Sequence, residues 1–212
     1  MTPTPTVVWL NGAFGAGKTQ TAYELQRRAP GCLVADPELL GYAIGRMDPA
    51  GIRDDFQDYP QWRSAVAATV ADAAESQAAT GRSQPVLVPM TLVNPDYFTE
   101  IIGSVRARGV VLHHFALTAS PEVLRRRLRT RHAYWIGTAL GRGETWAMRQ
   151  IDRCVTALAA PEFAEQIDTD ERGVDEVVEV LADRVGLPLV RSRLDPVRHQ
   201  LHRIAVGVRH IR

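Results

Sequence analysis

The chain has 212 residues, 45% of them hydrophobic and 23% charged, and its 25 basic side chains nearly balance 24 acidic ones. This length and composition predict one well-buried globular domain and exclude a disordered chain. No apolar run approaches the roughly 18 residues that a membrane span needs, and residues 1 to 17 carry none of the basic residues that open a secretory signal. The two cysteines, Cys32 and Cys154, fit neither a disulfide framework nor a metal site, so we expect a cytoplasmic location.

The basic side chains are unevenly divided, because 24 are arginine and only Lys18 is lysine. For most of the chain this bias has no mechanistic meaning. The rigid, planar guanidinium group is, however, a poor substitute for a compact ammonium group inside a phosphate-binding loop. A lysine kept at this single position therefore indicates a specific role for Lys18.

The first half of the chain predicts strands that alternate with helices. Apolar, β-branched runs bounded by turn residues predict strands, and runs of helix formers that end at Gly or Pro predict helices. We expect strands at residues 6–10, 32–35 and 85–93, helices at 19–28, 38–46, 62–80 and 96–108, and a polar surface loop at 48–59.

The second half continues this alternation. We expect strands at residues 110–117 and 166–169, helices at 120–130, 145–159 and 174–185, and a lid at 131–144, where Gly and aromatic residues gather. Strands that alternate with helices predict a parallel sheet covered on both faces. The expected fold class is therefore α/β, a three-layer domain with five parallel strands over residues 1–190, followed by a basic amphipathic tail over residues 191–212.

One motif carries most of the chemistry, a glycine-rich loop between the first strand and the first helix. It matches the phosphate-binding pattern of Gly, four residues, Gly, Lys and Ser or Thr. Such a loop points backbone N–H groups at phosphate oxygens, Lys18 adds a positive charge for the β and γ phosphates, and Thr19 places a hydroxyl on Mg²⁺. The predicted ATP-binding residues are Gly12, Ala13, Phe14, Gly15, Ala16, Gly17, Lys18 and Thr19.

Asp36, after the second predicted strand, is the residue that favours a phosphate-transfer function over an ATP-hydrolysing motor function. A motor ATPase normally has an acidic pair at the end of an apolar strand, whereas the third strand here ends in Met90 and Thr91, and no acid follows until Asp96. A carboxylate at the carboxyl end of a strand can orient and deprotonate an acceptor hydroxyl. The alternative is that Asp36 caps the helix that begins at Glu38.

An arginine cluster precedes the predicted lid. Phosphoryl transfer needs positive charge close to the γ-phosphate. We expect Arg127 and Arg131 to stabilise the transferring group and Arg125 to contact the nucleotide. The alternative for each of them is a solvated basic helix face.

These motifs together resemble the small P-loop phosphotransferases of the tunicamycin-resistance-protein type, which are related to chloramphenicol phosphotransferase and adenylate-kinase-like enzymes. The resemblance implies a kinase-like fold with a lid, use of ATP and Mg²⁺, and a role in antibiotic resistance. The residues that carry it are Trp9 to Thr19, Asp36-Pro37-Glu38 with Gly41, Asp58-Tyr59-Pro60 with Trp62, Ser120 to Arg131, Gln150 to Cys154, and Ile167-Asp168-Thr169.

Aromatic residues flank the loop where an acceptor would bind. Phe56, Tyr59 and Trp62 are candidates to stack on a nucleoside or to cover an acyl chain, and packing inside the fold is the alternative for each. We expect the acceptor to be a small molecule with a hydroxyl group, of the nucleoside-antibiotic type.

The tail differs in charge from the rest of the chain. Residues 191–212 hold six Arg and one Asp, a net charge of +5. Apolar residues recur at helical spacing in this segment, and we expect that apolar face to dock onto the domain or onto a second subunit in a homodimer. Contact with an anionic membrane is less favoured, and nucleic acid is not expected as a partner. The apolar positions are Val197, Leu201, Ile204, Ala205, Val208 and Ile211.

The sequence therefore predicts an ATP-dependent phosphotransferase that modifies a hydroxyl group of a small molecule. A second hypothesis is a binding protein that is gated by nucleotide and sequesters a drug without modifying it.

Overall fold

A computed structural model describes residues 2–47, 55–130, 146–163 and 165–209 of the chain. Its centre is a sheet of five parallel strands in the order β2-β3-β1-β4-β5. The strands are β1 Thr6–Gly12, β2 Leu33–Val34, β3 Val86–Pro89, β4 Val111–Thr118 and β5 Gln166–Asp168.

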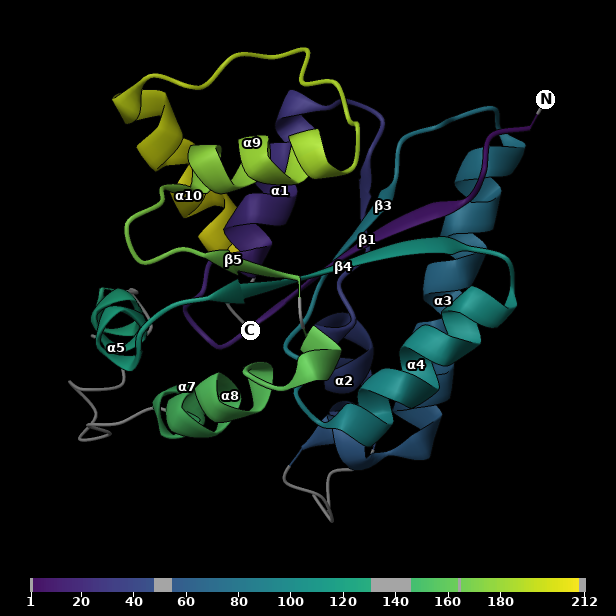
Figure 1. Cartoon of the computed structure of the whole chain (residues 1–212), viewed down its shortest axis with the longest axis horizontal. Coiled ribbons are helices and arrows are strands. Elements are labelled where there is room, and N and C mark those ends of the chain that lie inside the picture. The colour runs from purple at the N-terminus through teal and green to yellow at the C-terminus, as the bar shows by residue number, and fades with distance from the viewer. Residues whose placement is uncertain (1, 48–54, 131–145, 164, 210–212) are drawn as a thin grey trace.

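Helices cover both faces of this sheet, so the fold has the three expected layers. Helices α1 and α9 lie on one face and α3 and α4 on the other, while α5 lies beyond the carboxyl end of β4, and α7 and α8 lie alongside this end of the sheet (Figure 1). The helices are α1 Lys18–Arg28, α2 Glu38–Met47, α3 Pro60–Ala79, α4 Pro95–Ala107, α5 Pro121–Arg129, α7 Trp146–Arg149, α8 Ile151–Leu158, α9 Val174–Arg184 and α10 Pro196–Arg209, with short 3₁₀ turns η1 Phe56–Asp58 and η2 Pro161–Phe163.

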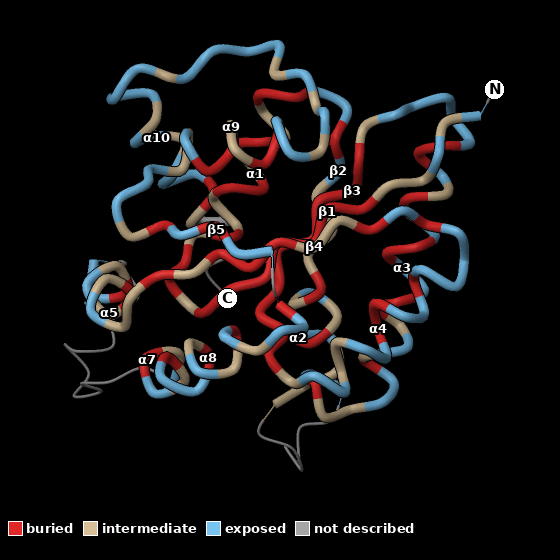
Figure 2. The backbone as a smooth tube through the Cα atoms, viewed as in Figure 1, coloured by how far each residue is buried: buried red, intermediate tan, exposed pale blue. Residues whose placement is uncertain are grey.

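Strand β1 shows why two helical layers are needed. Successive side chains of a strand point to opposite faces, and both sets are apolar here. Val8 and Leu10 pack into the cluster that includes α1 and α9, whereas Val7 and Trp9 pack into the cluster that includes α3 and α4. The central strands β1 and β3 are consequently buried along most of their length (Figure 2). The fold class predicted from the sequence is confirmed.

The structure shortens or divides two of the predicted elements. Strand β3 ends at Pro89 instead of Val93, because the Asn11 side chain takes both the N–H and the carbonyl of Leu92 out of strand pairing. The helix expected over 145–159 is divided at Gln150 into α7 and α8. The predicted lid, 131–144, lies outside the described residues, as do residues 48–54 of the predicted loop. The division of the chain at residue 190 remains a prediction.

The tail helix α10 does dock onto the domain, but with the face opposite to the expected one. His199, His202 and Val206 face the domain, and Val206 is 3% exposed. Val197 and Leu201 of the apolar stripe point outward and are 71% and 62% exposed. The expectation that the apolar face would dock onto this domain is therefore wrong, because the docked face meets an acidic, polar surface of α1. A membrane-crossing helix of sufficient length and apolarity does not occur within the described ranges.

Candidate active site

The glycine-rich loop joins β1 to α1 at the carboxyl edge of the sheet, and two of its glycines are required by geometry. Gly12 has φ 147°, and a Cβ at this position would lie 2.6 Å from the carbonyl oxygen of Leu117 in β4. Gly17 is the N-cap of α1 and has φ 98°, a left-handed conformation that disfavours any side chain. The first turn of α1 contains no acidic residue, so its positive end faces the loop uncompensated.

Lys18 lies inside this loop and is only 8% exposed. Its Nζ donates hydrogen bonds to the carbonyl oxygens of Gly12 at 2.9 Å and Ala13 at 3.0 Å, and it lies 5.6 Å from the centre of the Phe14 ring. Thr19 is half-buried beside it in the first turn of α1. The loop therefore holds a compact cation and a hydroxyl next to each other, as the motif predicts.

Two buried residues that the sequence analysis did not predict as site residues, Asn11 and Thr91, hold this loop in place through hydrogen bonds. Asn11 is fully buried, and its Oδ1 accepts hydrogen bonds from the N–H groups of Gly12 at 2.8 Å and Leu92 at 2.9 Å. Thr91, 2% exposed, donates its hydroxyl to the Gly12 carbonyl at 2.9 Å. A polar residue near the carboxyl end of each of two apolar strands is the signal that could have identified them. Thr91 lies two residues beyond β3, in the region where a motor ATPase would carry its acid.

Asp36 follows β2 at the same edge of the sheet and is half-buried. Its Oδ1 accepts a hydrogen bond from the N–H of Glu38 at 3.0 Å, so the helix-capping alternative is observed. A carboxylate has two oxygens, and a cap through Oδ1 is compatible with an additional role of this group toward a ligand. Asp36 therefore caps the start of α2 and is also an acid at the same edge of the sheet as the phosphate loop.

The predicted acceptor residues form a packed layer beside Asp36. The ring of Phe56 lies against Gly41 of α2, where an added Cβ would come within 2.6 Å of the ring. The centres of the Phe56 and Trp62 rings are 5.2 Å apart. Trp62 is fully buried, and its Nε1 donates to the Pro37 carbonyl at 3.1 Å. Tyr59 is half-buried at the start of α3. The contacts of Trp62 therefore fix the backbone next to Asp36.

Gln57 ties this acceptor segment to the phosphate loop. It is 8% exposed, and its Nε2 donates to the Thr91 carbonyl at 3.1 Å, while the hydroxyl of Thr91 binds Gly12. The η1 turn and the phosphate loop are thus joined through one threonine, which fixes how far apart their side chains lie.

The arginines of α5 have two different surroundings. Arg127 Nη1 donates to Thr169 Oγ1 at 3.0 Å and its Nη2 donates to the Thr169 carbonyl, which places it at the end of β5. Burial, together with the neighbouring Arg126, lowers the pKa of Arg127 below its usual value. Arg125 instead binds both carboxylate oxygens of Asp152 in α8, at 2.8 and 2.7 Å. Arg131 lies outside the described residues.

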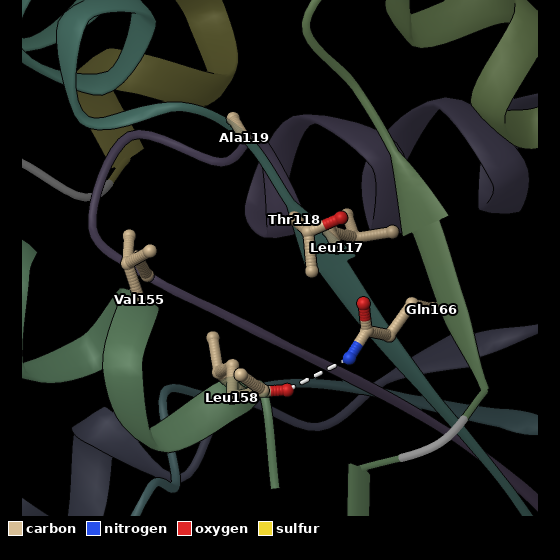
Figure 3. A pocket seen from close by; sticks show the side chains of 8 residues that line it. Leu117, Thr118, Ala119, Val155, Leu158 and Gln166 are labelled. Atoms are coloured by element: carbon tan, nitrogen blue, oxygen red, sulfur yellow. Dashed lines mark hydrogen bonds between the residues drawn. The ribbon is translucent and has the colours of Figure 1, made fainter.

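A small cavity lies beside the loop, between the end of β4 and α8 (Figure 3). It has a volume of about 190 Å³, and Gln166 is bonded across its rim to the Leu158 carbonyl at 2.9 Å. Apart from Gln166 and Thr118, the lining is apolar. The lining residues are Ala13, Leu117, Thr118, Ala119, Val155, Leu158, Ala159 and Gln166.

ATP and Mg²⁺ fit the residues that form this site. The loop combines a buried ammonium group, a helix start without acids and a glycine cradle, which is the donor set that a triphosphate requires. The hydroxyl of Thr19 is an oxygen ligand of the kind that Mg²⁺ prefers.

A family model described as an AAA domain matches residues 7–161. The chain belongs to this family. The match spans β1 with its phosphate loop through the α8 segment, and α9 and α10 lie beyond it. No curated protein sequence matches the chain.

Solved structures share the architecture. The tunicamycin resistance protein of Deinococcus radiodurans is 28% identical, with a TM-score of 0.70 over 89% of this chain and 99% of that chain. This match confirms the resemblance predicted from the sequence. A sugar kinase from Janibacter sp. HTCC2649 is 20% identical, with a TM-score of 0.60 over 90% and 100% of the two chains, and a gluconokinase from Sinorhizobium meliloti 1021 is 17% identical, with 0.56 over 87% and 97%. The last two show that the AAA-family chain has a kinase-like P-loop fold.

Proposed function

We propose that this protein transfers the γ-phosphate of ATP to a hydroxyl group of a small molecule. The observation that carries the proposal is the pairing of a closed phosphate loop around Lys18 with an acid, Asp36, at the same edge of the sheet. The residue that contacts the loop after β3 is Thr91, where a motor ATPase would have an acidic residue. This threonine favours phosphate transfer over a motor function. The kinase-like fold supports this choice.

In the proposed reaction, the acceptor oxygen attacks the γ-phosphorus, a new O–P bond forms, and the bond to the bridging oxygen of ADP breaks. The acceptor proton passes to the carboxylate of Asp36. Lys18 and the loop N–H groups hold the phosphates, and Arg127 and Arg131 balance the negative charge of the transferring group. Mg²⁺, bound through Thr19, would neutralise phosphate charge.

We further propose that the acceptor is a nucleoside-type antibiotic and that its phosphorylation confers resistance. The 28% identity to a tunicamycin resistance protein supports this acceptor class. The aromatic layer of Phe56 and Tyr59 beside Asp36 offers surfaces on which a base can stack. We also propose that the protein forms a homodimer and is cytoplasmic, as the sequence predicts.

The test is mass spectrometry of candidate acceptors after incubation with protein, ATP and Mg²⁺. Tunicamycin is the first acceptor to test, followed by other antibiotics and nucleosides that are screened for acceptor-dependent release of ADP. A mass gain of one phosphate group, absent with Lys18→Ala protein, would support transfer.

The second hypothesis, sequestration of the drug, gives a different result in the same experiment. Tight, nucleotide-dependent binding of an acceptor whose mass stays unchanged would exclude phosphate transfer to that acceptor.

A further inference from the structure

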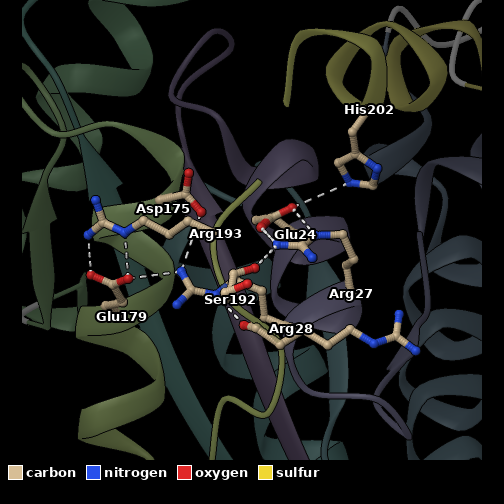
Figure 4. A network of polar contacts seen from close by, with 9 residues as sticks. Glu24, Arg27, Arg28, Asp175, Glu179, Ser192, Arg193 and His202 are labelled. Carbon is tan, nitrogen blue, oxygen red and sulfur yellow. Dashed lines mark hydrogen bonds and ion pairs between the residues drawn. The ribbon is translucent and has the colours of Figure 1, made fainter. Parts of the chain in front are cut away.

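The tail of this chain runs back along α1, from its last turn to its first. Figure 4 shows the middle of this path, where tail residues meet charged side chains of α1. Because α1 begins at the phosphate loop, the tail comes closer to this loop from residue 190 toward residue 203. The contacts in order are the N–H of Val190 to the Arg28 carbonyl at 2.9 Å, His202 Nε2 to Glu24 Oε2 at 3.6 Å, and Gln20 Nε2 to the Arg203 carbonyl at 3.1 Å.

Ion pairs around the buried side chain of Arg28 fix the first part of this path. Arg28, whose side chain is 7% exposed, binds Asp175 at 3.3 Å and Glu179 at 2.9 Å, both from α9. Its Nε also donates to the Arg191 carbonyl at 3.2 Å, and Arg193 binds Glu179. Charge-assisted bonds of this kind are stronger than neutral ones. The tail is therefore bonded to two helices of the domain before α10 begins.

Arg203 is the tail residue that this path brings to the first turn of α1, next to the phosphate loop. Gln20, which holds its carbonyl, directly follows Thr19 of the motif. The Arg203 side chain is exposed, and its guanidinium group has no hydrogen-bond or ion-pair partner among the residues that the structure describes. The backbone of Arg203 is thus bonded to the residue that directly follows Thr19, the Mg²⁺-binding position of the motif, and its exposed guanidinium group is available to a ligand.

A second arginine lies close to the same place. The positive charge of Arg203, together with that of Arg126, adds to burial in lowering the pKa of Arg127, while Asp170 and Asp168 act in the opposite direction. Like charges repel, so guanidinium groups that gather at the edge of a site are stabilised when an anion binds between them.

We propose that Arg203 is a nucleotide-binding residue and that α10 forms a wall of the ATP site, opposite Arg127 and Thr169. Its guanidinium group binds the phosphates that leave the loop beside Gln20. This inference rests on the proposed use of ATP. The AAA family match ends at residue 161, so this contact belongs to a part of the chain outside the matched domain.

Isothermal titration calorimetry with ATP and Mg²⁺ tests the proposal on the full chain. We expect Arg203→Ala to raise the Kd for ATP about tenfold, the loss of one charge-assisted contact, and Arg203→Lys to restore part of the affinity. Arg198→Ala is the matched control, because Arg198 is on the same helix, exposed, and bonded to Asp195 at 3.3 Å. Its Kd should equal that of the wild type.

Adenosine separates a phosphate contact from a general change at the site. Arg203→Ala should leave the Kd for adenosine unchanged, and an equal loss for adenosine and ATP would overturn the phosphate contact. If the wild type binds ATP and Arg203→Ala binds it equally well, the role of the tail is refuted while the proposed function stands. If the wild type does not bind ATP at all, the proposed function itself fails.

Discussion

The nucleotide side and the acceptor side of this site are built in different ways. The nucleotide side is one continuous segment, in which the backbone of Gly12 to Lys18 forms the cradle and Lys18 fills it. The acceptor side is assembled from separate segments, where Trp62 of α3 holds Pro37 and Phe56 packs on Gly41. The first depends on backbone geometry, and the second depends on side chains that meet only in the folded chain.

This difference has a consequence for substitutions. A change at Lys18 or in the backbone of the loop should alter ATP binding directly, because these groups form the cradle. A change in the acceptor layer acts first on packing and reaches the acceptor through the position of Asp36. Variants on the two sides should therefore separate ATP affinity from acceptor affinity.

The largest effect is expected at Lys18. Lys18→Ala should lower the rate of phosphate transfer about 10³-fold, because it removes the cation that the phosphates meet. Lys18→Arg should also impair ATP binding, since the planar guanidinium group does not fit between the carbonyls of Gly12 and Ala13. Calorimetry with ATP and assays of ADP release would measure both, with Arg82→Lys, at an exposed position, as control. Wild-type binding by Lys18→Arg would contradict the role of the ammonium group.

Asp36→Asn comes next and tests the acceptor side. Asparagine keeps an oxygen that can accept the hydrogen bond from Glu38, so the start of α2 should remain intact. We expect the transfer rate to fall about 100-fold while the Kd for ATP and the unfolding midpoint stay unchanged. Normal turnover with the true acceptor would show that Asp36 is only a helix cap.

The sequence predicted the nucleotide side more completely than the contacts that join separate segments, because the nucleotide side is one continuous segment. The loop is local, so spacing alone predicted a phosphate loop at Gly12 to Thr19, and the strand and helix that flank it are confirmed. Asn11 and Thr91 were missed because their partners lie about 80 positions apart in the chain, and only the pairing of β1 with β3 brings them together. The docked face of α10 was not predicted, because periodicity reveals an apolar stripe on a helix but not the surface of the domain that the helix contacts.

A smaller effect is expected from Trp62→Phe. The change removes the buried hydrogen bond from Nε1 to the Pro37 carbonyl, which should cost about 2 kcal/mol in the free energy of unfolding. Acceptor affinity should fall while ATP affinity is retained, because Pro37 adjoins Asp36 and not the loop. Urea denaturation and calorimetry would measure the two quantities. An equal loss of ATP affinity and acceptor affinity would contradict a role of Trp62 on the acceptor side alone.

Arg125→Ala should have the smallest effect on ATP affinity and on stability. This variant tests whether the nucleotide side includes Arg125. The sequence suggested that Arg125 contacts the nucleotide, but its guanidinium group binds Asp152, whose side chain is 71% exposed. Exposed ion pairs contribute less than about 1 kcal/mol, so stability should change little and the Kd for ATP should stay within about twofold of the wild type. Arg127→Ala, which removes a group bonded to Thr169, should raise that Kd about tenfold. Equal losses in the two variants would mean that Arg125 leaves Asp152 when ATP binds, and the nucleotide side would then extend to α8.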